Sequence, residues 1–451
     1  MRIDAEYFLK QNLLYEDLLN RHSCFVLGDI SIVTDGIHDS IDYDETSEIN
    51  LISATSPKDN YFDLTRNVHI SSEQHYKNPR TALRENDIIL STVGTIGNCA
   101  IVNKEILPAN SDRHVGIIRI KEELTPSVVS TFLLSKYGRN QTIRESTGNV
   151  QLNLFLYKIR AIKIPKFSSE FQNIIEDDYN FAQNLLINSK SYYIQAEDIL
   201  NKELNITNVE NSKNYSIKSL SESFVKSKRL DAEYYQDKYD QILDELKSTV
   251  TLSEICHIHT KNFTPIGKDL YKYIELADIS NSDGEICEPK QYYGKDLPNR
   301  ARRKIKKGQV LVSSIEGSLS SCALVMLDDV NLLCSNGVYV VDSDTINSET
   351  LLVLFKSRYI QLLLKQRCSG TILTSIGEND FDNLPFVKIN KKIQSQISQK
   401  VQESFKLRKQ SKDLLNKAVK AVDIAIEKSE EDAIKWLKEN TNEYFTNDKL
   451  K

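Results

Sequence analysis

The chain has 451 residues, of which 40% are hydrophobic and 27% charged, with a formal net charge of −5. It is about three times as long as a typical domain, and its apolar content suffices for packed cores, which excludes a largely disordered chain. No apolar run approaches the roughly 20 residues that span a bilayer, acids stand where a signal peptide is apolar, and the seven scattered cysteines indicate reduced thiols. These features exclude a secreted disulfide scaffold, a membrane protein and a fibrous protein, and we expect a cytoplasmic protein. The net charge does not exclude nucleic-acid binding, because binding depends on a local basic face.

Glycine and proline divide the chain into turn-rich and helical stretches. All 15 glycines and all 9 prolines lie in two windows, residues 28–165 and 265–385. Turns depend on these residues, whereas long helices exclude them. The order predicted is therefore a turn-rich domain, a helical segment, a second turn-rich domain and a second helical segment.

Both helical segments carry a stripe at alternating steps of three and four, typical of a coiled coil but interrupted by polar residues such as Asp178 and Ser189. Residues 168–204 hold seven acids and two bases, and residues 386–428 hold eleven bases and four acids. Opposite charge on helices of similar length predicts that the two pair with each other. The alternative is two independent, solvated helices.

The two halves of the chain repeat. Residues 2–8, Arg-Ile-Asp-Ala-Glu-Tyr-Phe, return at 229–235 as Arg-Leu-Asp-Ala-Glu-Tyr-Tyr. Residues 87–102 parallel 309–325 after a one-residue insertion, and Thr147-Gly148 parallels Ser369-Gly370. Each central copy predicts a strand, a tight glycine turn and a strand, in which Gly94 and Gly97 would let a backbone approach closely; an ordinary hairpin accounts for the same pattern.

Basic residues stand at the same place in both halves. The segment 295–307 has seven bases against one acid and is predicted to be a loop because it contains Pro298. Lys77, Arg80 and Arg84 occupy the equivalent place in the first half. A duplicated basic loop favours a phosphate-binding face, and arginine also reaches guanine edges. The alternative is a solvated loop that aids solubility.

The sequence contains no complete motif of a known catalytic site. Gly267-Lys268 lacks the spacing of a phosphate loop, and no Asn-Pro-Pro-aromatic run indicates an amino-methyltransferase. Cys256, His257 and His259 would supply part of a metal site, but no second cluster completes four ligands. The set Asp278, Glu288 and Lys290 leaves a metal-dependent nuclease as an alternative. We therefore predict no catalytic residue and no metal site.

The chain resembles the specificity (S) subunit of type I restriction-modification systems. The resemblance covers nearly the whole chain and depends on the order and duplication of short motifs. These motifs are residues 2–8 with 229–235, Thr34–His38, 87–102, 162–165 before the first long helix, Tyr273–Glu275, Asp278-Ile279 and Gly284–Ile286. The second half departs from the pattern, with Gly317-Ser318-Leu319-Ser320 in its glycine turn and an irregular approach to its helix.

The resemblance implies a mixed α/β fold with two duplicated target-recognition domains, separated by two long antiparallel coiled-coil-like helices. The domains expected are an N-terminal arm with the first recognition domain, the first spacer helix, a repeat arm with the second recognition domain, the second spacer helix, and a C-terminal tail containing Trp436. Their expected bounds are 1–166, 167–210, 211–388, 389–430 and 431–451.

The resemblance also implies a non-catalytic subunit that reads a bipartite DNA site, with one domain for each half-site. It implies recruitment of two methyltransferase subunits and, through them, of restriction subunits. This chain would bind no cofactor, while S-adenosylmethionine, ATP and Mg²⁺ would belong to the partners. The alternatives left open are a specificity-like adaptor of another phage-defence system, the nuclease above, and a coiled-coil scaffold without DNA contact.

The candidate DNA-binding residues combine the duplicated basic segments with three loops that the repeat or the resemblance singles out. They are Lys77, Arg80, Arg84, Arg300, Arg302, Arg303, Lys304, Lys306 and Lys307, with Asp35, His38, Gly148, Asn149, Gly370 and Thr371 in the loops.

Overall fold

The computed structural model describes residues 5, 7–64, 67–121, 123–148, 151–206, 216–246, 250–286, 289–371 and 374–445. It contains two compact units. Unit 1 comprises Met1–Leu186 and Arg408–Lys451, and unit 2 comprises Ile187–Leu407. Among the described residues, no helix has the length and apolar character needed to cross a membrane.

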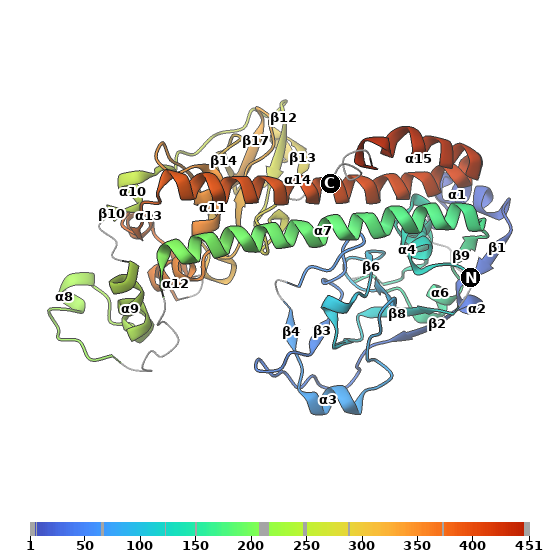
Figure 1. The fold of residues 1–451 in the computed structure, drawn as a ribbon, viewed down its shortest axis with the longest axis horizontal. Coiled ribbons are helices and arrows are strands. Elements are labelled where there is room, and N and C mark those ends of the chain that lie inside the picture. Colours follow the sequence, from blue (N-terminus) through green and yellow to red (C-terminus); the bar gives the residue numbers. More distant parts are fainter. Residues whose placement is uncertain are drawn as a thin grey trace. The chain divides into compact units, whose positions relative to one another are not determined.

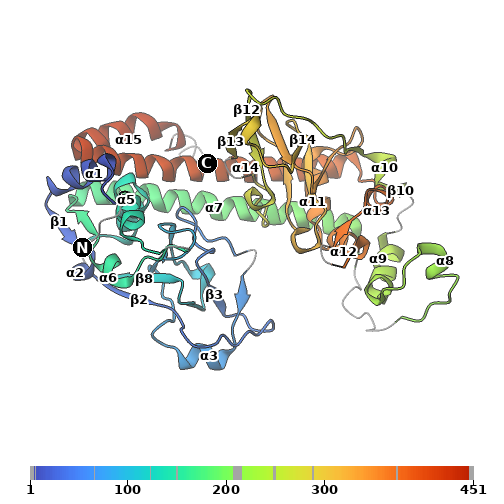
Figure 2. The ribbon, with the colours of Figure 1, turned by 180° about the vertical axis from the view of Figure 1, so that it is seen from behind.

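Unit 1 is built on a four-stranded sheet with the order β2-β8-β5-β6 and a three-stranded sheet with the order β4-β3-β7. Helix α4 packs against β6 of the first sheet and α5 packs against α4, and α3, β3 and β4 lie on the side of the unit remote from α7 (Figures 1 and 2). The elements are α1 (Lys10–Asn20), β1 (Cys24–Val26), α2 (Leu27–Ile30), β2 (Ser31–Asp35), β3 (Asn50–Ile52), β4 (Val68–His69), α3 (Ser72–Lys77), β5 (Ile88–Ser91), β6 (Cys99–Ile101), η1 (Lys104–Ile106), β7 (Ala109–Ser111), β8 (Val115–Ile120), α4 (Pro126–Leu134), α5 (Lys136–Glu145), α6 (Leu156–Arg160) and β9 (Lys163–Pro165).

Unit 2 has two four-stranded sheets, with the orders β11-β18-β15-β16 and β13-β12-β17-β14. Its elements are α8 (Phe224–Ser227), η3 (Ala232–Tyr235), α9 (Asp237–Leu246), β10 (Val250–Thr251), α10 (Leu252–Ile255), β11 (His257–His259), β12 (Leu270–Ile274), η4 (Leu276–Asp278), β13 (Lys290–Tyr293), η5 (Gly294–Asp296), β14 (Ala301–Lys304), β15 (Val310–Ser313), η6 (Glu316–Ser318), β16 (Cys322–Leu324), β17 (Leu332–Ser335), β18 (Val338–Asp342), α11 (Ser348–Lys356), α12 (Arg358–Arg367), β19 (Cys368–Ser369), β20 (Ser375–Ile376), α13 (Glu378–Asp382) and β21 (Pro385–Phe386).

The repeat seen in the sequence is a repeat of topology. The sheet β2-β8-β5-β6 corresponds to β11-β18-β15-β16, and a parallel strand pair occurs in both units, β3 with β7 and β12 with β17. The predicted hairpins are confirmed as the antiparallel pairs β5–β6 and β15–β16. The units differ at β14, because a single bridge between Ala82 and Asn110 stands in its place in unit 1.

Helix starts are encoded in the same way in both units. The side chains of Thr125 and Asn347 accept backbone N–H bonds at the starts of α4 and α11, and Ser135 and Ser357 do so for α5 and α12. Such caps satisfy amides that lack an intrahelical partner. In each unit the first of these helices, α4 or α11, packs buried apolar residues against the main sheet, and the second, α5 or α12, packs against the first, so that local signals and burial agree in both copies.

The two long predicted helices are confirmed. Helix α7 is Ser169–Leu204 and α14 is Lys391–Glu427. They pair antiparallel: Ser411 Oγ donates to the Ala182 carbonyl at 2.7 Å in unit 1, and the hydroxyls of Ser189 and Ser404 lie 3.1 Å apart in unit 2. The mixed α/β class and the paired helices are therefore as predicted, and the interpretation as two independent helices is wrong.

The residues predicted to be a C-terminal tail include a packed helix, α15 (Glu430–Phe445), which folds back alongside α14 (Figures 1 and 2). Ala433 and Leu437 are buried in the core of unit 1, and Trp436 packs against it. Glu430 also accepts the Ser168 backbone N–H at 3.1 Å, just before α7. This helix therefore belongs to the core of unit 1.

Candidate nucleic-acid interface

In unit 1, loops from distant parts of the sequence adjoin one another at one end of the main sheet. The Ile37 N–H donates to the Ser111 carbonyl at 2.8 Å, which joins the end of β2 to the end of β7. The Thr92 N–H donates to His114 at 3.1 Å, and the Thr92 carbonyl accepts from Leu154 at 2.9 Å. We call these segments the loop edge of unit 1. They are residues 35–38, 80, 92–97, 112–114, and 147–148 with 151–153.

Three predicted residues meet within this edge. The Arg80 guanidinium donates to the Asp35 carboxylate at 2.8 Å and to the Gly36 carbonyl at 3.2 Å. His38 Nε2 lies 2.7 Å from the other oxygen of Asp35. Burial alone would raise the pKa of Asp35, but the hydrogen bonds from Arg80 and His38 outweigh it and hold that pKa below its ordinary value. The pair leaves more than half of the Arg80 side chain exposed and fixes its direction.

Gly36 allows this close arrangement. A Cβ atom at this position would lie 2.1 Å from the Asp112 carbonyl oxygen and 2.2 Å from that of Ser111. Any side chain would therefore push the end of β2 away from the turn after β7. Gly94, in contrast, has open space around it, and Gly97 approaches Thr142 of the same unit.

Unit 2 has a matching loop edge. The Asn336 N–H donates to the Arg300 carbonyl at 2.8 Å, and the Ser314 N–H donates to Gly337 at 3.0 Å. The Ser314 carbonyl accepts from Ile376 at 2.8 Å, and the Glu316 N–H donates to Thr374 at 3.1 Å. The loop edge of unit 2 thus comprises residues 300, 314–321, 336–337, and 369–371 with 374–375. Arg300 is exposed in it.

The loops that follow α5 and α12 share an unusual backbone conformation. Gly148 has φ of 145° and Gly370 has φ of 127°, a region that favours glycine. Thr371 follows Gly370 and is exposed. Asn149, the remaining candidate in this set, lies outside the described residues.

The basic segment 295–307 is not the continuous loop that was predicted. Residues Ala301–Lys304 form β14, which pairs with β17, and alternation along a strand turns Ala301 and Arg303 inward. Arg303 is only 7% exposed, and its guanidinium donates to the His259 carbonyl at 3.3 Å. Arg303, predicted to bind DNA, is therefore buried against the strands of unit 2, and its burial does not favour that role. The position of Arg303 still matches that of Arg80. Arg80 bonds to the Gly36 carbonyl just after β2, and Arg303 bonds to the His259 carbonyl at the end of β11.

The remaining basic candidates do not gather at the loop edges. Arg84 stands before the start of β5, and Lys306 and Lys307 stand before the start of β15. The loop edges begin at the other ends of these strands, after Ser91 and Ser313, which is about 10 Å away along each strand. Lys77 ends α3 and pairs with Glu73, and both are exposed. The other two have local contacts: Arg302 donates to the Asn299 carbonyl, and Lys304 lies over the Phe263 ring.

Sequence reasoning missed Arg113 and His114. Both lie in the turn between β7 and β8, within the loop edge of unit 1, where Arg113 is exposed and His114 lies 3.2 Å from Asp112. The matching turn in unit 2 is Asn336-Gly337. Extending the alignment of the halves past the glycine turn would have pointed to both turns.

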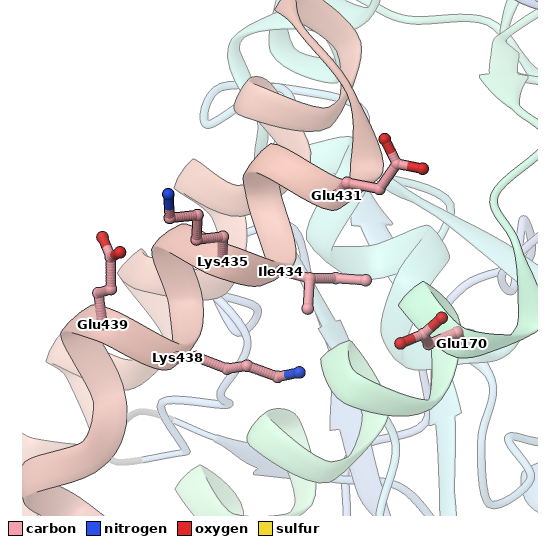
Figure 3. Close-up of a pocket in the computed structure, with 6 residues that line it drawn as sticks. All are labelled: Glu170, Glu431, Ile434, Lys435, Lys438 and Glu439. Carbon is pink, nitrogen blue, oxygen red and sulfur yellow. The ribbon is translucent and has the colours of Figure 1, made fainter.

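A surface hollow of about 450 Å³ lies between the start of α7 and α15. Figure 3 shows Glu170 and Lys438 directed into it and Lys435 and Glu439 directed away. Its lining mixes charges of both signs around Ile434, without the apolar walls typical of a small-molecule site.

The residues of the nuclease alternative have other contacts. The Asp278 carboxylate accepts the Glu275 N–H at 2.9 Å, Lys290 begins β13, and Glu288 lies outside the described residues. His257 and His259 pair with Asp344 and Asp342 at the surface. Within the described ranges, no three His, Cys, Asp or Glu side chains are grouped so that they could hold a metal ion.

No family model matches the sequence, and no curated protein matches it. The structure does match the S subunit of a type I restriction-modification system from M. genitalium, with 14% identity and a TM-score of 0.40, over 90% of this chain and 94% of that one. It also matches the HsdS subunit from Thermoanaerobacter tengcongensis, with 14% identity and a TM-score of 0.29, over 90% of this chain and 97% of that one. Matches at these TM-scores carry no argument for function; the repeat and the two loop edges do.

Proposed function

We propose that this chain is the DNA-recognition subunit of a type I restriction-modification complex, that it has no catalytic role, and that each unit reads one half of a bipartite site. The observation that carries the proposal is the duplication of the loop edge. Two units of the same topology each gather several loops at the same end of the same sheet, with an exposed arginine in each, Arg80 and Arg300. Two similar surfaces in one chain suit two separate half-sites.

The long helices would set the gap between the half-sites. Helix α7 has 36 residues and is therefore about 54 Å long. Successive major-groove segments on one face of DNA lie about 34 Å apart. A helix pair of this length would therefore suffice to link two reading units along the duplex.

The partners proposed are double-stranded DNA, two methyltransferase subunits and, through these, restriction subunits. S-adenosylmethionine, ATP and Mg²⁺ would serve the partners. The five predicted domain ranges remain part of the proposal, in which each recognition domain would comprise the sheets and short helices of one unit.

Sequencing methylated bases in genomic DNA, with the gene intact and deleted, tests this function. We expect deletion to abolish methylation at one bipartite motif, which would also reveal both half-sites. Unchanged methylation would contradict the proposal and would favour an adaptor of a different defence system, whose partner would then be sought by pull-down.

The exposed arginines of the loop edges provide a second test. Changing Arg80 and Arg300 together to alanine is expected to weaken binding of the cognate duplex about 10- to 100-fold and to reduce the salt dependence, because phosphate or base contacts would be lost. Fluorescence anisotropy at several salt concentrations measures both effects.

Two exposed lysines outside the edges give the matched control. Lys10→Ala with Lys268→Ala removes the same charge and is expected to change affinity less than threefold. The double variant Arg84→Ala with Lys307→Ala then tests whether DNA binds at the other ends of β5 and β15, away from the loop edges. A larger loss from that set than from Arg80 and Arg300 would show that the loop edges are not the DNA-binding surface.

A further inference from the structure

The repeated motif at 229–235 makes a set of contacts that neither the fold nor the proposed function explains. The Arg229 guanidinium donates to the Cys368 carbonyl at 2.7 Å and to the Gln366 and Arg367 carbonyls at 3.4 and 3.5 Å. These carbonyls end α12 and begin β19. A guanidinium group at the C-terminal end of a helix donates hydrogen bonds to carbonyls that have no partner within the helix.

The rest of the motif holds Arg229 in place. Asp231 accepts two bonds from the guanidinium, at 2.8 and 2.6 Å, and the Tyr235 hydroxyl donates to the Arg229 carbonyl at 2.8 Å. The Tyr234 ring lies 4.4 Å from the guanidinium carbon. The Arg229 side chain is 18% exposed and that of Asp231 is 46% exposed, so the guanidinium is largely shielded from water while the carboxylate that orients it lies at the surface.

Arg229 therefore acts at the base of the loop between β19 and β20. Cys368 pairs with Ile376 and Ser369 with Ser375, and the loop beyond them contains Gly370 and Thr371. On its other side, the loop bonds to the glycine turn through the Thr374 carbonyl and the Glu316 N–H. The loop is thus held between the glycine turn and the carbonyls that Arg229 binds.

The first copy of the motif docks at the matching place. The Tyr7 carbonyl accepts a bond from Arg144 Nε at 2.8 Å, as the Tyr234 carbonyl does from Gln366 at 2.9 Å. The Tyr7 hydroxyl donates to Glu145 at 2.9 Å. Arg144 and Glu145 end α5, directly before the loop that contains Gly148. Residues 2–4 and 6 of this copy lie outside the described residues.

We infer that the repeated motif positions the reading loop that follows the second helix of each unit, and that Arg229, oriented by Asp231, is the positioning residue for the loop residues 369–371 and 374–375. The inference rests on the proposed function, because that loop belongs to the loop edge of unit 2. Arg229 itself need not touch DNA. It acts through the backbone of Cys368 and so sets where Gly370 and Thr371 stand.

Arg229→Lys in the full chain is the sharpest variant, because lysine keeps the charge but cannot bond Asp231 and three carbonyls at once. We expect hydrogen exchange to quicken in the segment 368–376 and to stay unchanged in the rest of unit 2. We also expect discrimination against single base changes to fall about tenfold in one half-site only, with an unchanged salt slope, since no phosphate contact is lost. Asp231→Asn should reproduce both effects more weakly.

Lys268→Ala is the control, since it removes an exposed charge of unit 2 far along the sequence from the motif. Unchanged exchange at 368–376, or loss of discrimination in both half-sites equally, would overturn the inference. A lower unfolding midpoint with faster exchange throughout unit 2 would also overturn it, because Arg229 would then serve only stability. If the parent chain binds no DNA sequence specifically, the proposed function fails and the inference fails with it.

Discussion

Replacing Asp178 by leucine is expected to raise the free energy of unfolding of unit 1 by about 3 kcal/mol at pH 8. Asp178 lies in the stripe of α7 that faces α14 and is only 4% exposed. Its Oδ2 atom has no hydrogen-bond partner within the described part of the chain. By the register that Ser411 and Ala182 set, it lies opposite Leu415, so a leucine would pack against apolar neighbours.

The expected gain depends on pH. Burial, followed by repulsion from Asp177, raises the pKa of Asp178 to about 7, while Lys417 on α14 acts in the opposite direction. In the unfolded chain this carboxyl titrates near 4. Between pH 4 and pH 7 the folded state therefore holds a proton that the unfolded state releases. The free energy of unfolding falls as pH rises through this range, and above pH 7 the whole cost of burying the charged Asp178 carboxylate is present. The gain from leucine should be about 2–3 kcal/mol smaller at pH 5 than at pH 8.

The measurement is urea unfolding followed by the fluorescence of Trp436, the sole tryptophan, which packs against the core of unit 1. Asp177→Asn is the control, since it removes an exposed charge of the same helix and only the smaller, repulsive contribution to the pKa of Asp178, so its gain should be well below that of Asp178→Leu. A destabilised Asp178→Leu variant, or an equal gain at both pH values, would show that Asp178 has an ionic partner in the folded chain.

Local patterns predicted the elements of this protein well. The helices α7 and α14 followed from a window without glycine or proline, and the hairpins β5–β6 and β15–β16 followed from short β-branched runs around a glycine turn. The same window predicted helix beyond residue 385 but did not mark the break after Glu427, because neither glycine nor proline stands there; only the resemblance placed an end of the helix near residue 430, and it did not predict that the tail would form α15. The turn at Lys428-Ser429 is fixed by tertiary packing, because α15 buries its apolar residues in the core of unit 1.

The candidate site was predicted less well, because it depends on which strands pair. A basic run in a strand points to both faces, so Arg303 turned inward while Lys304 remained outside. Strand pairing also separated Arg84 from Arg80, since one precedes β5 and the other reaches the end of β2. The contact between Arg80 and Asp35 spans 45 residues, and nothing in the local sequence predicts it.

The two units hold different buried polar pairs just before the equivalent strands β5 and β15. Asp87, 1% exposed, accepts two bonds from Arg119, at 2.7 and 2.6 Å, and one from the Arg84 N–H at 2.8 Å. In unit 2 the corresponding positions hold Gln309 and Asp342, joined at 2.8 Å. The same place in the two sheets is thus filled by an ion pair in one and by an amide–carboxylate pair in the other.

Asp87→Ala is expected to lower the free energy of unfolding of unit 1 by about 3–5 kcal/mol, because it leaves the Arg119 charge without its buried partner and the Arg84 N–H without an acceptor. Urea unfolding followed by Trp436 fluorescence measures the loss. The double variant Asp87→Gln with Arg119→Asp rebuilds the arrangement of unit 2 and should recover about half of the loss.

Full recovery is not expected, because Asp342 has a second partner. His259 Nε2 lies 2.8 Å from the Asp342 carboxylate, and strand pairing places Thr34 at the matching position of unit 1. Adding Thr34→His to the double variant should therefore restore a further part of the stability. If the double variant is no more stable than Asp87→Ala alone, the two units do not use this position in the same way, and the structural equivalence of their sheets does not extend to their buried polar pairs.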